Sequence, residues 1–229
     1  MSFIDTLLAA ERPLIMEVKR RDADGGDLLG GRPVGDVVAA YEAAGAPCLS
    51  VVTGRWFGGD LDLLREVADL TGRPLLQKDF VTRHDQVPRA ARLGASAVLL
   101  TAALLPRSSL RSLVAVCLEE GLTPFVEVTT EEEIAAVPDA DRCVIAVNNK
   151  DIKVRERDQG DVERSLKLLP ALARSGTRCP VSASGIDGPP VAARLLDHGY
   201  AGLLVATALL RATSPRAWSD DVHALRTTS

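Results

Sequence analysis

The chain has 229 residues, of which 46% are apolar and 25% charged, and its formal net charge is −4 with a pI near 5.5. These fractions are typical of an ordinary globular protein, so they exclude a fibrous or wholly disordered chain. The mildly acidic balance, without a basic tail, argues against nucleic acid or an anionic membrane as the main partner.

The sequence shows no membrane segment and no export signal. Its longest apolar runs, such as residues 201–210, are shorter than the ~20 residues that span a bilayer, and no basic segment precedes an apolar one at the start. We therefore expect a cytoplasmic protein. A disulfide framework or a zinc site is not expected, because the cysteines lie far apart without a CxxC pair: Cys48, Cys117, Cys143 and Cys179.

Short runs rich in Val, Ile and Leu recur along the chain and predict strands that are buried on both faces. In chain order these are residues 14–18, 48–53, 75–77, 97–101, 124–128, 143–147, 179–182 and 202–206. Helical periodicity lies between several of them, at residues 34–44, 61–70, 110–118 and 166–172. Glycine readily takes the left-handed conformation that ends a helix, and we expect it to do so at Gly45, Gly72, Gly94, Gly121, Gly176 and Gly199.

The regular alternation of strands and helices predicts a parallel sheet. Eight such units fit a single-domain (β/α)8 TIM barrel over residues 1–229. A doubly wound open sheet is the alternative, but that fold normally has fewer strands, and no Gly-x-Gly-x-x-Gly follows the first one. No linker or low-complexity segment divides the chain.

In a barrel of this kind the active site lies at the carboxyl ends of the strands. The polar residues at these ends are Glu17, Lys19, Lys78, Asp79, Glu127, Asn148, Asn149, Lys150, Ser182, Ser184 and Thr207. Lysine is otherwise scarce, since the remaining two are Lys153, just past a strand end, and Lys167, on a predicted helix surface. A rim of ammonium and carboxylate groups suits an anionic substrate and proton transfer.

Purely structural interpretations of these residues remain open. Inward charges can pair without catalysing anything, Glu17 with Lys19 or Glu127 with Lys78. Polar residues at a strand end can also cap the following loop. We interpret Asp22 and Asp24 as loop carboxylates rather than metal ligands. The scarcity of lysine can equally reflect codon bias.

Several ordered motifs carry a resemblance to the indole-3-glycerol phosphate synthase family, whose members are (β/α)8 enzymes of tryptophan biosynthesis. The motifs are Ile-Met-Glu-Val-Lys-Arg at 15–20, Tyr-Glu-Ala-Ala-Gly-Ala at 41–46, Phe-Gly-Gly-Asp at 57–60, Leu-Gln-Lys-Asp-Phe at 76–80, Val-Glu-Val at 126–128, Val-Asn-Asn-Lys-Asp at 147–151 and Ser-Ala-Ser-Gly-Ile at 182–186. Together they extend over nearly the whole chain, from about residue 3 to residue 211.

The resemblance implies a lyase that closes an anthranilate-derived carboxyphenylamino deoxyribulose phosphate to an indole, with loss of carbon dioxide and water. Lys78 would be the general acid on the ribulose carbonyl, and Glu127 would transfer protons during dehydration. Lys19 would meet the substrate carboxylate with Glu17 as its polarising partner, and Asn148 would hold the substrate hydroxyls. The other implied substrate-binding residues are Phe57, Phe80, Lys150, Ser182, Ser184, Gly185 and Thr207. No metal or organic cofactor is implied.

The sequence also departs from the family pattern. The first strand begins at Leu14, so the helix that precedes it in relatives and covers the barrel mouth is expected to be missing. Residues 21–24 replace a Ser-Pro-Ser type loop and add negative charge, and Ala183 replaces a glutamate. Ala206 replaces a glycine of the phosphate turn, and Lys150 replaces an arginine.

Three hypotheses follow for the function. The first is an indole-3-glycerol phosphate synthase-like carboxy-lyase that acts on a small anionic molecule. The second, suggested by residues 21–24, Ala183 and Ala206, is a paralogue that acts on a related substrate in specialised metabolism. The third is a barrel that binds a metabolite without catalysis, which the retention of all the acid–base residues disfavours. The sequence predicts no oligomeric state.

Overall fold

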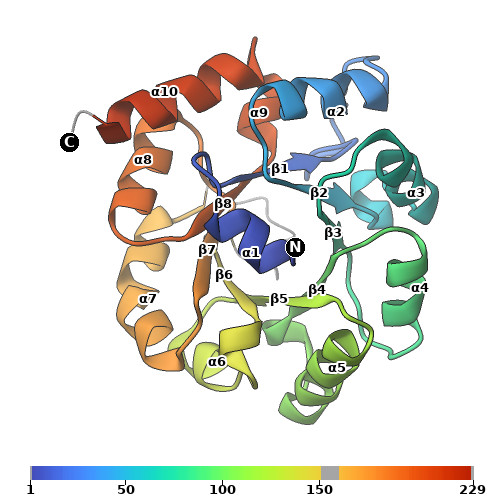
Figure 1. Ribbon diagram of the computed structural model, residues 1–229, viewed down its shortest axis with the longest axis vertical. Helices are drawn as coiled ribbons and strands as arrows, with labels where there is room; N and C mark the ends of the chain where they lie inside the picture. Colours follow the sequence, from blue (N-terminus) through green and yellow to red (C-terminus); the bar gives the residue numbers. More distant parts are fainter. Residues whose placement is uncertain (1, 151–159, 228–229) are drawn as a thin grey trace.

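The computed structural model describes residues 2–150 and 160–227, where eight parallel strands close into one barrel in chain order. The strands are β1 (Leu14–Val18), β2 (Cys48–Val52), β3 (Leu75–Lys78), β4 (Ala97–Thr101), β5 (Thr123–Val128), β6 (Val144–Asn148), β7 (Cys179–Ala183) and β8 (Gly202–Val205). Each strand pairs with the next, and β8 pairs with β1. The predicted (β/α)8 TIM barrel is therefore confirmed, and Figure 1 looks down its ring of strands. Lys153 lies outside the described residues.

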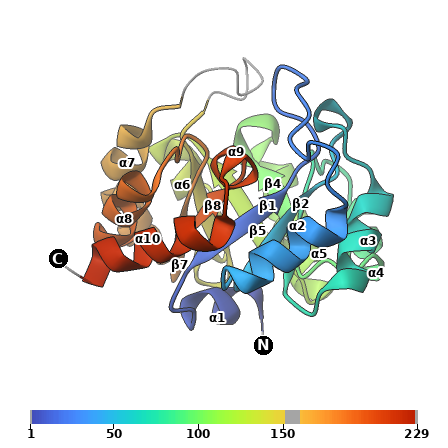
Figure 2. The ribbon, with the colours of Figure 1, turned by 90° about the horizontal axis from the view of Figure 1, so that it is seen from above.

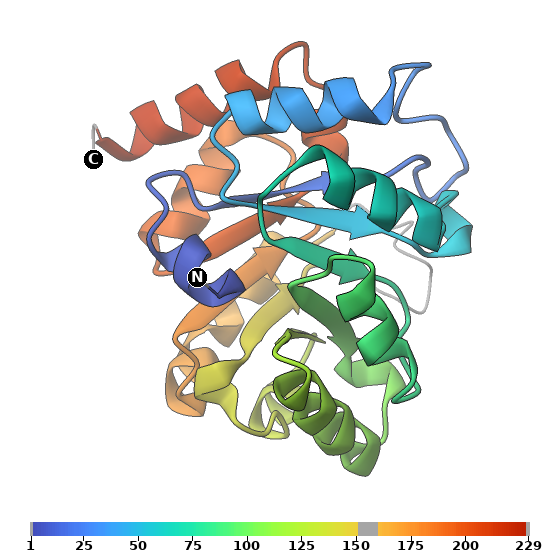
Figure 3. The ribbon, with the colours of Figure 1, turned by 45° about the vertical axis from the view of Figure 1, so that its right-hand side comes forward.

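Helices surround the strands on the outside of the barrel, as Figure 3 shows from a tilted direction. They are α2 (Val34–Ala43), α3 (Leu61–Leu70), α4 (Gln86–Arg92), α5 (Arg107–Glu119), α6 (Glu131–Ala135), α7 (Val162–Ser175), α8 (Pro189–Asp197), α9 (Thr207–Arg211) and α10 (Pro215–Thr227), with short 3-10 turns η1 (Arg55–Phe57), η2 (Ala102–Leu104) and η3 (Ala140–Arg142). Among the described residues no helix is both long and apolar enough to cross a membrane.

The expected glycine helix ends are confirmed at five of the six positions. The backbone has a positive φ at Gly45, Gly94, Gly121, Gly176 and Gly199. Gly72 is the exception, because α3 ends with Thr71 in an extended conformation instead. An extended residue carries the chain directly from this helix towards β3, so no left-handed residue is needed there.

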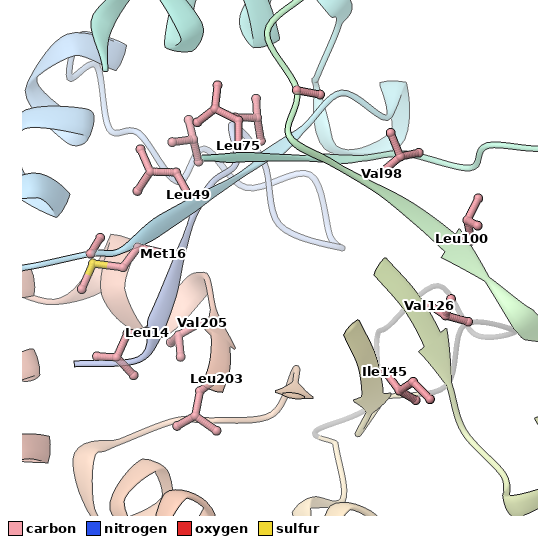
Figure 4. Close-up of a cluster of buried hydrophobic side chains, with 14 of the residues drawn as sticks. Leu14, Met16, Leu49, Leu75, Val98, Leu100, Val126, Ile145, Leu203 and Val205 are labelled. Carbon is pink, nitrogen blue, oxygen red and sulfur yellow. The ribbon is translucent and has the colours of Figure 1, made fainter. Parts of the chain in front are cut away.

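The strand residues divide between two hydrophobic clusters because successive side chains of a strand point to opposite faces. One cluster packs between the strands and the helices, and Figure 4 draws members of it such as Met16, Leu49, Val126 and Ile145. The other fills the barrel interior with residues such as Ile15, Leu76 and Phe125. Side chains two positions further along a strand share its face. Residues two or four positions after these inward-facing ones therefore also point into the barrel, nearer its carboxyl-terminal end.

Helix α1 (Phe3–Leu8) closes the amino-terminal end of the barrel, an element that the sequence patterns did not predict. Phe3, Ile4 and Leu7 are buried in the interior cluster, and the Phe3 ring meets the Phe125 ring edge-on at 6.2 Å. A Cβ atom on Gly202 would lie 2.9 Å from a Leu7 methyl carbon, so the glycine lets the helix approach closely. Figure 2 shows α1 at the end of the barrel opposite α9.

Candidate active site

Four strands place five acid–base and amide side chains near their carboxyl ends, at positions that face the barrel interior. Glu17 lies in β1, and Lys19 follows that strand's last residue. Lys78 ends β3, Glu127 is the next-to-last residue of β5, and Asn148 ends β6. Glu17, Lys19, Glu127 and Asn148 are all at most 5% exposed. The barrel thus brings the ammonium and carboxylate groups to one end of its interior.

Glu17 is the centre of the charged cluster. Its Oε2 atom lies 3.3 Å from the Lys78 ammonium and accepts a hydrogen bond from the Ser50 hydroxyl at 2.9 Å. The two charged side chains are only 1% and 11% exposed. This pair is not among the structural pairs suggested by the sequence, which are Glu17 with Lys19 and Glu127 with Lys78. It forms because β1, β2 and β3 lie side by side, with Ser50 of β2 opposite Glu17 and Lys78 at the end of β3.

Aromatic rings line the side of the mouth that η1 forms. The Lys19 ammonium lies 3.8 Å from the centre of the Phe57 ring, close enough for a cation–π interaction. The Phe80 ring packs edge-on against Trp56, with ring centres 5.6 Å apart, and both of these rings are exposed. Phe57 therefore lies beside the charged cluster, while Phe80 lies on the rim.

A pocket of about 500 Å³ opens beside the charged cluster, and most of its lining comes from the segment after β7, from β8 and from the segment after β8. Seven of the expected site residues line it: Glu17, Lys19, Lys78, Lys150, Ser184, Gly185 and Thr207. Glu127, Asn148, Phe57, Phe80 and Ser182 do not line it. Ala206, Asp187 and Arg211 are further lining residues.

Ser182 and Asn149 belong to a buried network on the outer face of the barrel wall. The Asn149 amide nitrogen donates to the Ser182 hydroxyl and to the Ser184 carbonyl, both at 3.0 Å. The Ser165 hydroxyl of α7 donates to the Asn149 side-chain oxygen and lies 2.8 Å from the Ser182 hydroxyl. The network therefore holds α7 against β6 and β7 and fixes the turn at Ser184, where φ is +67°.

Asn148 points the other way, into the barrel. Its side-chain oxygen accepts a hydrogen bond from the Lys150 backbone at 2.9 Å, but its amide nitrogen has no partner among the described residues. The Thr101 hydroxyl, at the end of β4, is likewise buried without a partner among the residues described. The register places Ala183 beside Asn148, where the family pattern has a glutamate. Burial of an amide N–H group without a hydrogen-bond acceptor costs free energy. The Asn148 nitrogen is therefore suited to bind a hydroxyl or carbonyl oxygen of a ligand.

Residues 21–24, which in the sequence stand out only by their negative charge, begin an ordered turn. Asp22 accepts backbone hydrogen bonds from Gly26 at 2.7 Å and from Asp24 at 3.1 Å. The Gly26 bond, together with the Asp24 bond and the charges of Arg211 and Lys19, keeps the pKa of Asp22 below its usual value. Asp22 is thus a loop carboxylate, as the sequence indicated, and it also lies close to the cations of the mouth.

Three contributors to the site were not found from the sequence. Ser50 gave a weak signal, as a lone hydroxyl inside an otherwise apolar strand. Trp56 and Arg211 gave none, because their contacts join segments that are far apart in the chain. Among residues 2–150 and 160–227, no group of three or more His, Cys, Asp or Glu residues is placed to hold a metal ion.

Comparisons with known proteins agree on one family. A family model described as indole-3-glycerol phosphate synthase matches residues 1–222. The indole-3-glycerol phosphate synthase of Thermococcus kodakarensis is 38% identical over 208 residues, which cover 90% of each chain. The tryptophan biosynthesis protein TrpCD of Archaeoglobus fulgidus is 36% identical over 224 residues, which cover 96% of this chain and 40% of that protein. Among solved structures, 3-hexulose-6-phosphate synthase from Salmonella typhimurium covers 94% of this chain and 98% of that one with a TM-score of 0.71, and at 12% identity this likeness shows the fold alone.

Proposed function

The chain belongs to the indole-3-glycerol phosphate synthase family, and from this premise we propose that it closes a carboxyphenylamino deoxyribulose phosphate to indole-3-glycerol phosphate in tryptophan biosynthesis. The enzyme is a lyase that decarboxylates and cyclises its substrate. The observation that carries the proposal is the position of Lys78, which lines the pocket and whose nearly buried ammonium lies beside Glu17.

Lys78 is the proposed general acid. A proton donated from its ammonium to the ribulose carbonyl oxygen makes the carbonyl carbon electrophilic enough for the aromatic ring to attack. Glu17 supports this role because its carboxylate, 3.3 Å away, stabilises the ammonium before the transfer. Loss of carbon dioxide from the ring carbon that made the attack then restores the aromatic system. Departure of the former carbonyl oxygen as water completes the indole.

The other residues have proposed roles in binding and in the later proton transfer. Glu127 accepts or returns protons during dehydration, and Lys19 pairs with the substrate carboxylate. The unpartnered Asn148 amide supports a hydrogen bond to a substrate hydroxyl. Phe57, whose ring lies against the Lys19 ammonium, and Phe80 on the rim lie outside the described pocket lining, and they are proposed to contact the substrate's aromatic ring on that side.

The phosphate is proposed to bind at the turn after β7 and at the start of α9. Ser184 and Gly185 both have positive φ, so successive backbone N–H groups there can form an anion-binding concavity. Thr207, with Lys150 across the pocket, adds a hydroxyl and a positive charge. Ser182 supports the turn through Asn149 rather than by lining the pocket.

A paralogue acting on a different substrate was the second candidate, suggested by Ala183 and Ala206. The family match over residues 1–222 and the similarity to enzymes of that name do not favour it.

The test is turnover of the family substrate, followed through the absorbance or fluorescence of the indole product. We expect the protein to form indole-3-glycerol phosphate, Lys78→Met to abolish turnover, and Lys167→Met, on the exposed face of α7, to leave it intact. Circular dichroism of both variants checks the fold. Absence of product from the unaltered, folded protein would overturn the proposal, and so would full activity of Lys78→Met. Growth of a tryptophan auxotroph lacking this synthase gives an independent readout.

A further inference from the structure

An ion pair beside the pocket joins two segments that are distant in sequence. The Arg211 guanidinium, at the end of α9, lies 2.8 Å from the Asp22 carboxylate, in the loop after β1. Arg211 also lines the pocket, together with Ser184, Gly185 and Thr207. A cation of the pocket is therefore held by a carboxylate of the protein itself.

Arg211 lies on its helix on the same side as Thr207, and both residues line the pocket in which phosphate is proposed to bind. Thr207 and Arg211 are four residues apart in α9, so they lie on the same helix face. Helical side chains lean towards the amino-terminal end of their helix, and here that end begins at Thr207, beside the pocket. A guanidinium in this place can donate two parallel hydrogen bonds to phosphate oxygens.

Asp22 has two separable functions because its two oxygens have different partners. Oδ1 accepts the backbone hydrogen bonds of Gly26 and Asp24 and so forms the turn, whereas Oδ2 faces Arg211. The arginine side chain is 65% exposed, and that of Asp22 is 20% exposed. A partly solvated pair of this kind is weak, so a dianionic phosphate can replace the carboxylate on the guanidinium.

We propose that Arg211 is a phosphate-binding residue of this enzyme and that Asp22 occupies its guanidinium until the substrate phosphate displaces it. The proposal rests on the proposed function, which supplies a phosphate monoester as the substrate. It also accounts for the negative charge of residues 21–24 at a mouth that receives an anion. The loop carboxylate acts as an internal competitor and is neutralised by Arg211 while the pocket is empty of phosphate.

Binding of inorganic phosphate, measured by isothermal titration calorimetry, tests the proposal without turnover. Asp22→Asn keeps the side-chain oxygen that forms the turn but removes the competing charge. It should tighten phosphate binding about two- to fivefold, in line with the strength of a partly exposed pair. Arg211→Gln should weaken binding about tenfold or more, since it removes a charge-assisted contact. The KM for the family substrate should shift in the same directions.

Asp60→Asn is the matched control. Asp60 also accepts a backbone hydrogen bond, from Leu63 at 2.7 Å, and pairs with an arginine, Arg20, at 2.9 Å, but neither of these charged side chains lines the pocket. The Asp60→Asn variant should therefore leave the Kd of phosphate unchanged. In the double variant Asp22→Asn/Arg211→Gln, the gain in phosphate affinity from Asp22→Asn should vanish, because the guanidinium for which Asp22 and phosphate compete is gone.

The outcomes separate the two proposals. Unchanged or weaker phosphate binding by Asp22→Asn, or unchanged binding by Arg211→Gln, would overturn the displacement of Asp22 while turnover by the unaltered enzyme still stood. Absence of turnover together with the expected shifts in phosphate affinity would instead remove the proposed reaction and leave Arg211 as a phosphate ligand.

Discussion

The Glu17–Lys78 pair allows a quantitative test of whether the charged cluster behaves as one unit. At 3.3 Å, the attraction between two unit charges is about 5 kcal/mol at an effective dielectric constant of 20. Desolvation of both groups offsets much of this attraction. For the pair we therefore expect a net coupling energy of about 1–3 kcal/mol, in the upper part of the range found for contacting groups.

The measurement is a double-mutant cycle with Glu17→Gln, Lys78→Met and the double variant, using urea unfolding followed by circular dichroism. Glu17→Gln should lower the free energy of unfolding by about 3 kcal/mol, because it leaves the nearly buried Lys78 ammonium without this carboxylate. The double variant should lose less than the sum of the single losses by the coupling energy. All three variants should be inactive, so the cycle measures the stability of the cluster apart from its chemistry.

The exposed pair of Arg174 and Glu131 is the control for burial. Its atoms lie closer, at 2.9 Å, but the side chains are 66% and 57% exposed. The cycle of Arg174→Met and Glu131→Gln should therefore give a coupling energy below about 1 kcal/mol. Additive losses at Glu17 and Lys78, within about 0.5 kcal/mol, would refute the reasoning, because burial would then fail to strengthen the pair.

Three further predictions concern stability. Leu7→Ala should destabilise the protein by about 2–5 kcal/mol in chemical unfolding and leave kcat unchanged, since Leu7 is fully buried at the end of the barrel opposite the site; a loss of kcat would contradict this separation. Thr101→Val should raise stability by up to about 1 kcal/mol in the same assay, because it removes a buried hydroxyl that has no partner among the described residues; a loss would mean that the hydroxyl is bonded. Burial raises the pKa of four thiols to about 12: Cys48, Cys117, Cys143 and Cys179. The folded chain keeps these protons where the unfolded chain loses them, so the free energy of unfolding should fall as the pH rises from about 9 towards 12. A profile that stays flat over that range would contradict the burial of the thiols.

The strands could be predicted closely from the sequence because barrel strands are buried on both faces and appear as short, nearly continuous apolar runs. The eight runs differ from the observed strands by one residue at most at either end. Helix α1 escaped prediction because its six residues, Phe3–Leu8, are too few to show a helical period. Its partners, such as Phe125, come from strands much later in the chain.

The site could be predicted only as a set of strand-end residues, not as a set of contacts. Asn148 and Asn149 look alike in the sequence, but strand alternation sends one into the barrel and the other towards Ser182. The partner of Glu17 depends on how β1, β2 and β3 lie side by side, which no local pattern specifies. The contact of Arg211 with Asp22 depends on the closure of the whole ring.

Helix α1 plugs the amino-terminal end of the barrel, so in the part of the chain that the structure describes the barrel interior is reached from the pocket at the opposite end. Phe3, Ile4 and Leu7 seal the far end with apolar side chains, so substrate, carbon dioxide and the indole product all pass through the mouth near Lys150 and Arg211. Release of product and binding of substrate therefore use the same opening. The product must leave the pocket before the next substrate binds, and it should inhibit the enzyme competitively with respect to the substrate.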